Sequence, residues 1–333
     1  MGAVYGRTWR DGRLEREDFP LAELSDLLAD PGLLVWLHLD RPEPEKLESL
    51  AEELGFDPHA VEDALAPDER AKATRHGSHT FITCYLTRLE VDGSGTMQLR
   101  TPRISAFVLP QALITVGTAG VEVQPFIDRW EDDDLLGLGV GALLHGLLDT
   151  VVDGHFEAIQ ELDDAAEDLE DLLFADSVPH DSRRNRRIQQ RIYGVRKALV
   201  QLRRKVLPMR EVVSAVMRGR TADEPSHREL DGYFDDLYDH VIRAAEWSES
   251  LREVVGNAFE TNLSLQDARL NDIMKKLAGW GAIIAIPTAV TGWVGQNLPF
   301  PGAGTPWGVA VSTAMIVAGA VGLYVLFRRV DWL

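Results

Sequence analysis

The sequence predicts a membrane protein of the α+β class, with an N-terminal α/β domain, a long helical stalk and two C-terminal transmembrane helices. Three observations support this prediction. Residues 1–135 mix strand-like and helix-like runs, residues 136–276 have helical periodicity almost throughout, and residues 277–333 contain two long apolar runs. These ranges are the three expected domains, and the last includes a short external loop at 296–306.

Charge and composition separate a water-soluble body from a membrane segment. The chain has 333 residues, 34 Lys+Arg and 53 Asp+Glu, for a net charge of −19. Residues 277–327 hold no charged residue or His over 51 positions, and the last six residues add +1, so residues 1–276 carry −20. Cys84, the single cysteine, excludes a disulfide framework and is expected to be a small core residue. An ordinary soluble enzyme is therefore not expected.

The N-terminal domain has the pattern of an α/β fold. Leu33–Leu39 is apolar except for His38 and predicts a buried strand, and residues 44–54 have leucines at helical spacing. A turn is expected at 92–95, where Gly and Asp cluster. Three more β-rich runs predict strands at 81–86, 104–108 and 112–116.

Long helices are expected between residues 143 and 277. Breaks containing proline at 177–181 and 221–226 divide this region into three helices, and Pro208 is expected only to kink one of them. Residues 161–171 contain seven acids and no base, whereas residues 183–205 contain ten Arg/Lys and no acid. We expect an antiparallel hairpin with complementary charge.

The segregated charge leaves two other interpretations open. The acidic run could collect divalent cations, and the basic run could meet anionic lipid headgroups. Nucleic acid is not an expected partner, because the net charge of the domain opposes a polyanion.

Two apolar runs predict membrane-spanning helices. Leu277–Gly295 and Trp307–Phe327 are 19 and 21 residues long, and about 20 helical residues cross a bilayer core. Basic pairs at 275–276 and 328–329 flank the spans, and the loop between has none. By the positive-inside rule both termini are cytoplasmic, and the chain is a multi-pass protein of the cytoplasmic (inner) membrane. A buried hairpin of a soluble protein is the alternative.

One face of the first span is small or polar toward its outer end. Steps of three and four residues place its members on one side of a helix. Such a face suits either a pore or a tight helix–helix contact. Pro287 frees a carbonyl near residue 283, which is tolerated in protein packing or beside water. The face consists of Asn271, Met274, Leu277, Gly281, Ala285, Thr288 and Gly292.

The sequence contains no pattern typical of catalysis or of an organic cofactor. The closest histidines, His76 and His79, could suggest zinc, but surface histidines explain them more simply. Residues 137–141 lack the context of a dinucleotide-binding loop and are expected to form a flexible joint. The chain also has no P-loop and no serine elbow.

Several short motifs follow one another in a specific order. Asn271-Asp-Ile-Met-Lys275 leads into the first span, Ile286–Gly292 reads Ile-Pro-Thr-Ala-Val-Thr-Gly, and Gly295-Gln-Asn297 ends it. The chain finishes with Trp332-Leu333. With the upstream stretches 61–64, 207–212 and 233–240, this order resembles the CorA-type divalent cation channels over nearly the whole chain.

The resemblance implies a homopentamer in the lipid bilayer, in which the first spans line one pore and the long helices form a cytoplasmic funnel and stalk. It implies uptake of divalent cations, Mg²⁺ above all, with Co²⁺ and Ni²⁺ accepted by some members. Gly295, Gln296 and Asn297 would form the selectivity filter, and the face described above would line the pore. Asp236, with Glu90 of a neighbouring subunit, would bind a regulatory Mg²⁺.

The sequence departs from the family pattern at the filter. Gln296 replaces the usual Met, Val294 stands where an aromatic residue is usual, and residues 298–306 contain no acid. An uncharged loop is also seen in the sister ZntB group, which moves Zn²⁺. A proton-coupled Zn²⁺ transporter therefore remains an alternative, and a membrane scaffold without transport is a third.

Overall fold

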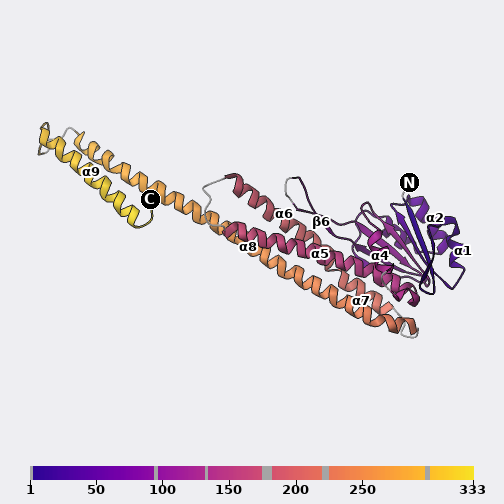
Figure 1. Ribbon diagram of the computed structural model, residues 1–333. Coiled ribbons are helices and arrows are strands. Elements are labelled where there is room, and N and C mark those ends of the chain that lie inside the picture. Colours follow the sequence, from indigo (N-terminus) through magenta and orange to yellow (C-terminus); the bar gives the residue numbers. More distant parts are fainter. Residues whose placement is uncertain (1–2, 94–96, 132–133, 175–181, 220–224, 297–300) are drawn as a thin grey trace. The chain divides into compact units, whose positions relative to one another are not determined.

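The computed structural model describes residues 3–93, 97–131, 134–174, 182–219, 225–296 and 301–333 (Figure 1). The chain divides into two compact units, residues 1–258 and 259–333, and the division falls inside helix α8 (Pro225–Val294). The domain limits expected at 135 and 276 remain predictions.

A mixed seven-stranded sheet forms the centre of the first unit. Its order is β2-β1-β3-β9-β8-β5-β4, and only β3 and β9 are parallel among these neighbours. Strands β6 (Arg88–Val91) and β7 (Met97–Arg100) form a separate ribbon. The strands of the sheet are β1 (Val4–Arg10), β2 (Arg13–Glu17), β3 (Leu33–Asp40), β4 (Lys72–Arg75), β5 (Thr80–Tyr85), β8 (Arg103–Val108) and β9 (Ala112–Gly117).

Both faces of the sheet are covered, which is why β3 is apolar at nearly every position. Val35 and Leu37 face a core shared with helices α1 (Leu24–Leu28), α2 (Pro44–Leu54) and α3 (Pro58–Leu65). Leu34 and Trp36 face a second core, shared with α4 (Gln124–Glu131) and the long helices. Short 3-10 turns lie at Leu21–Glu23 and Asp134–Leu138.

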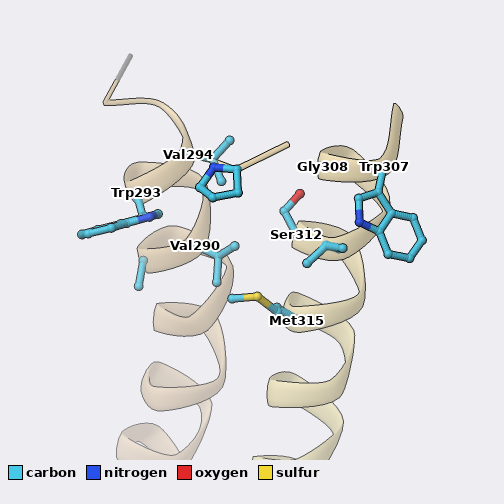
Figure 2. Close-up of a pocket in the computed structure, with 10 residues that line it drawn as sticks. Val290, Trp293, Val294, Trp307, Gly308, Ser312 and Met315 are labelled. Atoms are coloured by element: carbon cyan, nitrogen blue, oxygen red, sulfur yellow. The ribbon is translucent and has the colours of Figure 1, made fainter. Parts of the chain in front are cut away.

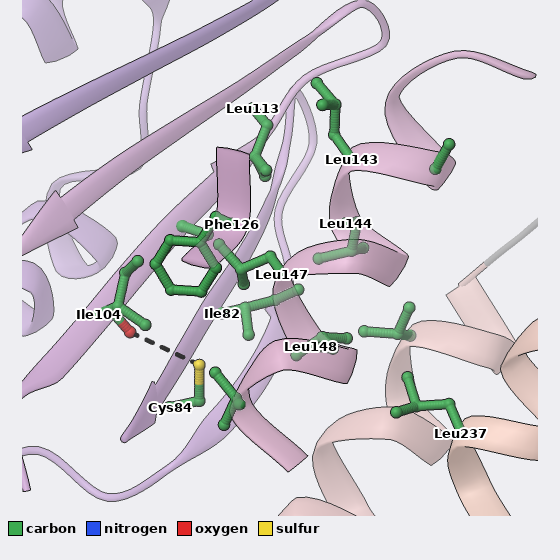
Figure 3. Close-up of a cluster of buried hydrophobic side chains, with 14 of the residues drawn as sticks. Ile82, Cys84, Ile104, Leu113, Phe126, Leu143, Leu144, Leu147, Leu148 and Leu237 are labelled. Carbon is green, nitrogen blue, oxygen red and sulfur yellow. Dashed lines mark hydrogen bonds between the residues drawn. The ribbon is translucent and has the colours of Figure 1, made fainter. Parts of the chain in front are cut away.

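The second core confirms the interpretation of Cys84 (Figure 3). Its side chain is 1% exposed and lies among Ile82, Ile104 and leucines of α5, with Sγ 3.8 Å from the Ile104 carbonyl oxygen. Burial raises the pKa of the Cys84 thiol to about 12. The thiol is therefore a small apolar group at neutral pH.

The described residues of the long region form four helices where three were expected. They are α5 (Val140–Phe174), α6 (Ser182–Val206), α7 (Met209–Gly219) and α8. The prediction for Pro208 was wrong, because this residue lies in the turn between α6 and α7 instead of kinking one helix. Its ring nitrogen has no hydrogen to donate, and its carbonyl oxygen accepts from Glu211 and Val212 instead. Residues 177–181 and most of 221–226 lie outside the described residues.

The expected hairpin is formed by α5 and α6, but apolar side chains join them. Ala165, Leu169, Ile192 and Leu199 are buried, and an ion pair connects Arg191 to Asp168 at 3.3 Å. Many charged side chains of both blocks are exposed instead. The flexible joint expected at 137–141 contains Gly139, whose positive φ of 86° favours glycine, directly before α5.

The second unit contains the end of α8 and helix α9 (Pro306–Arg329). Among the described residues, two helices are long and apolar enough to cross a membrane: Arg228–Val294, through its apolar C-terminal part, and Pro306–Arg329. Thr305 caps α9, since its hydroxyl accepts from the Gly308 amide at 3.2 Å. Protein covers at most 6% of the most apolar 18 residues of either helix. The core helix of a soluble protein would be mostly buried.

Candidate functional site

The face predicted on the first span is entirely exposed in the single chain. Its seven residues lie along α8, and each of them is exposed. Met274 and Leu277 expose 68% and 74% of their surface, although both are apolar. On a helix long and apolar enough to cross a membrane, an uncovered apolar row can face lipid, another helix or a pore, and small residues beside it suit close helix–helix contact or a pore.

Helix α9 packs against a different side of α8. Gly319 of α9 meets Ile286, where an added Cβ would lie 3.0 Å from the isoleucine Cγ2. Gly279 of α8 faces Leu333 and Phe327, and the ring of Trp280 lies 6.4 Å from that of Tyr324.

At about 100° per residue, Gly279 and Ile286 lie on roughly the opposite side of α8 from Leu277 and Thr288. The small residues that serve the contact between the spans are Gly279 and Gly319. Those of the predicted face do not, so within one chain the tight-packing interpretation of that face fails.

The hydroxyl of Thr288 is oriented by its own helix. Its Oγ1 donates to the Ile284 carbonyl oxygen at 3.1 Å, which leaves the oxygen lone pairs to accept from water or to face a cation. Thr291 makes the same kind of bond to the Pro287 carbonyl oxygen at 2.8 Å. Pro287 lies inside α8 as predicted.

The outer end of the face is a turn. Helix α8 ends at Val294, and Gly295 donates its amide to the Thr291 carbonyl oxygen at 2.9 Å. A Cβ on Gly295 would lie 3.1 Å from that same oxygen, so the close approach favours glycine. Gln296 is exposed in this turn, whereas Asn297 lies outside the described residues.

A groove that was not anticipated lies between α8 and α9 near this turn (Figure 2). Its volume is about 510 Å³, and Val290, Trp293, Trp307 and Met315 are among its lining residues. The Ser312 hydroxyl in it already donates to the Val309 carbonyl oxygen at 3.0 Å. The groove is on the α9 side of α8 and offers little that would bind a cation.

Sequence reasoning also missed Leu263 and Leu270, which are 45% and 59% exposed. They precede Leu277 at intervals of seven residues, which is the spacing of a coiled-coil seam. The seven-residue interval is visible in the sequence, but the sequence does not show which helix would pack against these leucines.

The two acids proposed for regulation are not joined in one site within the chain. Asp236 lies on α8 with its Oδ2 3.7 Å from Nδ1 of His240. Glu90 lies in β6 and pairs with Arg100 at 2.9 Å. In the parts of the chain that the structure describes, no group of three His, Cys, Asp or Glu could hold a metal ion.

The interpretation of His76 and His79 as surface residues was wrong. His79 is 4% exposed, and its ring stacks on that of His76 with centroids 5.0 Å apart. His76 pairs with Asp57 at 3.3 Å. Burial, and then the neighbouring His76, lower the pKa of His79. A hairpin turn tucked against Phe56 explains the burial, and no zinc site is formed among the described residues.

Comparison with known proteins places these features in a family. A family model described as "CorA-like Mg2+ transporter protein" matches residues 32–329. The cobalt/magnesium transport protein CorA of Methanocaldococcus jannaschii is 24% identical over 316 residues, covering 93% of this chain and 95% of that protein. The zinc transport protein ZntB of Yersinia pseudotuberculosis is 29% identical over 323 residues, covering 92% and 90%.

The fold is also similar to a solved structure. The complete structure of the CorA magnesium transporter from Methanocaldococcus jannaschii matches with a TM-score of 0.75 at 22% identity, covering 99% of this chain and 98% of that one. At this identity the likeness concerns the fold, and it agrees with the α+β architecture and two C-terminal helices predicted above.

Proposed function

Because the chain belongs to the family of CorA-like Mg²⁺ transporter proteins, we propose that it forms a homopentameric channel that admits Mg²⁺ to the cytoplasm. The coarser function, divalent metal ion transport, follows from the family and its cobalt/magnesium and zinc relatives. Co²⁺ and Ni²⁺ are proposed as secondary substrates. The function is transport across a bilayer and not catalysis.

The observation that carries the proposal is the free face of α8. It is exposed from Asn271 to Gly292, while α9 occupies another side of the same helix. Copies of α8 arranged about an axis would turn these faces toward one another. Small and polar residues at the outer end, including Thr288, then surround a space, and Met274 and Leu277 narrow it.

The chemistry of these residues suits hydrated Mg²⁺. This ion gives up water reluctantly and prefers oxygen ligands. Rings of Thr288 hydroxyls, and of amide and carbonyl oxygens at Gly295, Gln296 and Asn297, would hold it through its water shell. Rings of Met274 and Leu277 would close the pore by excluding water.

Regulation by cytoplasmic Mg²⁺ follows from electrostatics between subunits. Asp236 has a side chain that is 69% exposed, so the Glu90 of a neighbouring subunit can approach it. Two carboxylates repel one another unless a cation lies between them. Low cytoplasmic Mg²⁺ would empty the site, let the subunits move apart and open the pore.

The proposed orientation places both termini in the cytoplasm and the chain in the cytoplasmic (inner) membrane. The basic pairs at 275–276 and 328–329 lie at one end of the two spans, and the loop at 296–306 carries no charge. Basic residues stay on the cytoplasmic side.

Proton-coupled Zn²⁺ transport is the second candidate. The loop at 296–306 contains no acid to attract cations, and the zinc transport protein ZntB matches most of the chain. This candidate differs from the first in its ion and its driving force.

Flux into liposomes distinguishes the two. The purified protein is reconstituted with an internal Mg²⁺ or Zn²⁺ indicator, and each ion is added outside with and without a proton gradient. Mg²⁺ entry driven by an inside-negative potential is the expected result. Zn²⁺ entry that needs the proton gradient would replace the proposal with the zinc candidate. Absence of flux for both ions would contradict transport and favour a scaffold.

A further inference from the structure

Helix α6 carries a face that the rest of the chain leaves uncovered. One side of the helix is buried, with Ile188, Val195 and Leu202 in the core. The opposite side is exposed, and its residues follow one another in steps of four and three, as one helical face requires. We call this face the basic stripe; it consists of Arg186, Gln190, Tyr193, Lys197, Val200 and Arg204.

The basic stripe differs from an ordinary solvated face in two ways. Tyr193 and Val200 are 68% and 41% exposed, so large apolar groups alternate with the cations. In addition, none of Arg186, Lys197 and Arg204 forms an ion pair with a residue that the structure describes. Exposed Tyr and Arg side chains together are enriched where proteins meet one another.

Helix α5 carries the opposite charge at a matching spacing. Its acidic stripe consists of Asp153, Glu157, Glu161 and Asp164, which are all exposed and share one face. Within the described parts of the chain none of the four forms an ion pair. Burial, and then repulsion by Glu157 and Asp164, raise the pKa of Glu161, and the nearby Arg88, itself paired with Glu122, only partly offsets this rise.

The acidic stripe matches part of the basic stripe in length. Eleven positions separate Asp153 from Asp164, about 16 Å along a helix, and eighteen separate Arg186 from Arg204, about 27 Å. They belong to adjacent helices of one hairpin, and both point away from its apolar joint. One chain therefore offers two different, complementary surfaces.

We propose that the basic stripe of α6 docks on the acidic stripe of α5 in a second copy of this chain. The inference rests on the proposed homopentamer and names one of its subunit contacts. A contact between two different patches is head-to-tail, and its repetition closes a ring when the rotation allows. Tyr193 and Val200 lie against the neighbouring α5, and the cations neutralise its acids.

An anionic lipid surface is a poorer occupant of the basic stripe. Such a surface would attract α6 but repel the acids of the adjacent α5, and residues 1–276 carry a net charge of −20. A second copy satisfies both stripes at once. Because these charges remain near solvent, the contact weakens as ionic strength rises.

Cysteine cross-linking in the full-length protein tests the contact. Lys197→Cys and Asp164→Cys chains with different tags are co-expressed, purified in detergent and treated with a short bismaleimide. Buried Cys84 gives no background. We expect a cross-link between the two differently tagged chains, and none when Lys197→Cys or Asp164→Cys is expressed alone. Glu45→Cys, on exposed α2, replaces Asp164→Cys as the control and gives no cross-link.

Charge reversal provides an independent measurement. The cysteine sites are moved to Val200→Cys in one tagged chain and Glu161→Cys in the other, which lie side by side when Lys197 meets Asp164 across antiparallel helices. Lys197→Glu, Asp164→Lys or both changes are then introduced into both chains. Each reversal alone lowers the cross-linked fraction about tenfold, and both together restore it.

Three outcomes overturn the inference. Cross-links between two Lys197→Cys chains would show that α6 meets α6. A pentamer by mass measurement without any mixed cross-link would leave the channel proposal standing and reject this contact. Loss of binding to anionic vesicles in Lys197→Glu, with the cross-linked fraction unchanged, would assign the basic stripe to lipid. A chain that stays monomeric would instead reject the homopentamer itself.

Discussion

Replacing Thr288 with valine removes one hydroxyl from the proposed pore and keeps the side-chain shape. The hydroxyl donates to the Ile284 carbonyl oxygen at 3.1 Å, so its lone pairs are the part available to an ion's water shell. A hydrogen bond contributes about 1 kcal/mol net. If two hydroxyls of the ring contact the shell at once, their loss raises the barrier by about 2 kcal/mol, which lowers the flux about 30-fold.

Thr291→Val is the matched control for this experiment. Thr291 makes the same bond to a carbonyl four residues earlier, at 2.8 Å, and lies about 60° around the helix from Thr288. Both variants therefore lose similar helix stability. Mg²⁺ uptake is measured in liposomes with an internal indicator, and the assembly is checked by mass. Equal flux in Thr288→Val and the unaltered protein, or an equal loss in both variants, would refute the assignment of Thr288 to the pore.

Three further predictions concern the filter, the regulatory acid and a buried histidine. Asn297→Ala is expected to abolish Mg²⁺ flux with the pentamer intact in a liposome assay; unchanged flux would remove Asn297 from the filter. Asp236→Asn should weaken inhibition by cytoplasmic Mg²⁺, seen as a rightward shift of the inhibition curve, and an unaltered curve would count against that site. His155 is buried, which lowers its pKa from 6.5 to about 4. The unfolded chain therefore takes up the proton first, and stability present above pH 6.5 falls by about 3 kcal/mol toward pH 4. His155→Gln should flatten this loss in melting curves of the full chain, and an identical slope would contradict it.

The sheet shows which strands a sequence reveals. Strands β3, β5, β8 and β9 lie in the middle of the sheet and are apolar over most of their length, so their positions were predictable. Strand β1 carries Gly6 and two arginines, and its Gly6 is required because a Cβ there would meet the Phe19 ring at 2.6 Å. That contact is tertiary, and local patterns do not contain it.

The charged helices show a different limit. Periodicity predicted the hairpin of α5 and α6, but opposite charges in sequence do not specify which faces meet. Apolar side chains form the contact between α5 and α6, and the charged stripes remain exposed. Similarly, the sequence allowed Pro208 either to kink one helix or to separate two. The helices are separate, and α7 packs into the core through Met209 and Val212.

The part of the candidate site that lies on a single helix could be predicted from the sequence. Spacing alone identified the seven residues of the α8 face, because they follow helical geometry. The sequence could not show which side α9 would cover, since that depends on where Gly279 and Gly319 meet their neighbours. The burial of His79 also depends on tertiary contacts, with Phe56 and Phe107.

The most direct test of the account is whether the face of α8 lines the path of the ion. Ala285→Cys places a thiol on this face, and Ala318→Cys places one on an exposed position of α9; buried Cys84 gives no background. Mg²⁺ flux is measured before and after a cationic, water-soluble thiol reagent. The account predicts that the reagent blocks flux through Ala285→Cys and leaves Ala318→Cys unaffected. Unchanged flux in Ala285→Cys, with the thiol shown to be modified, would contradict it.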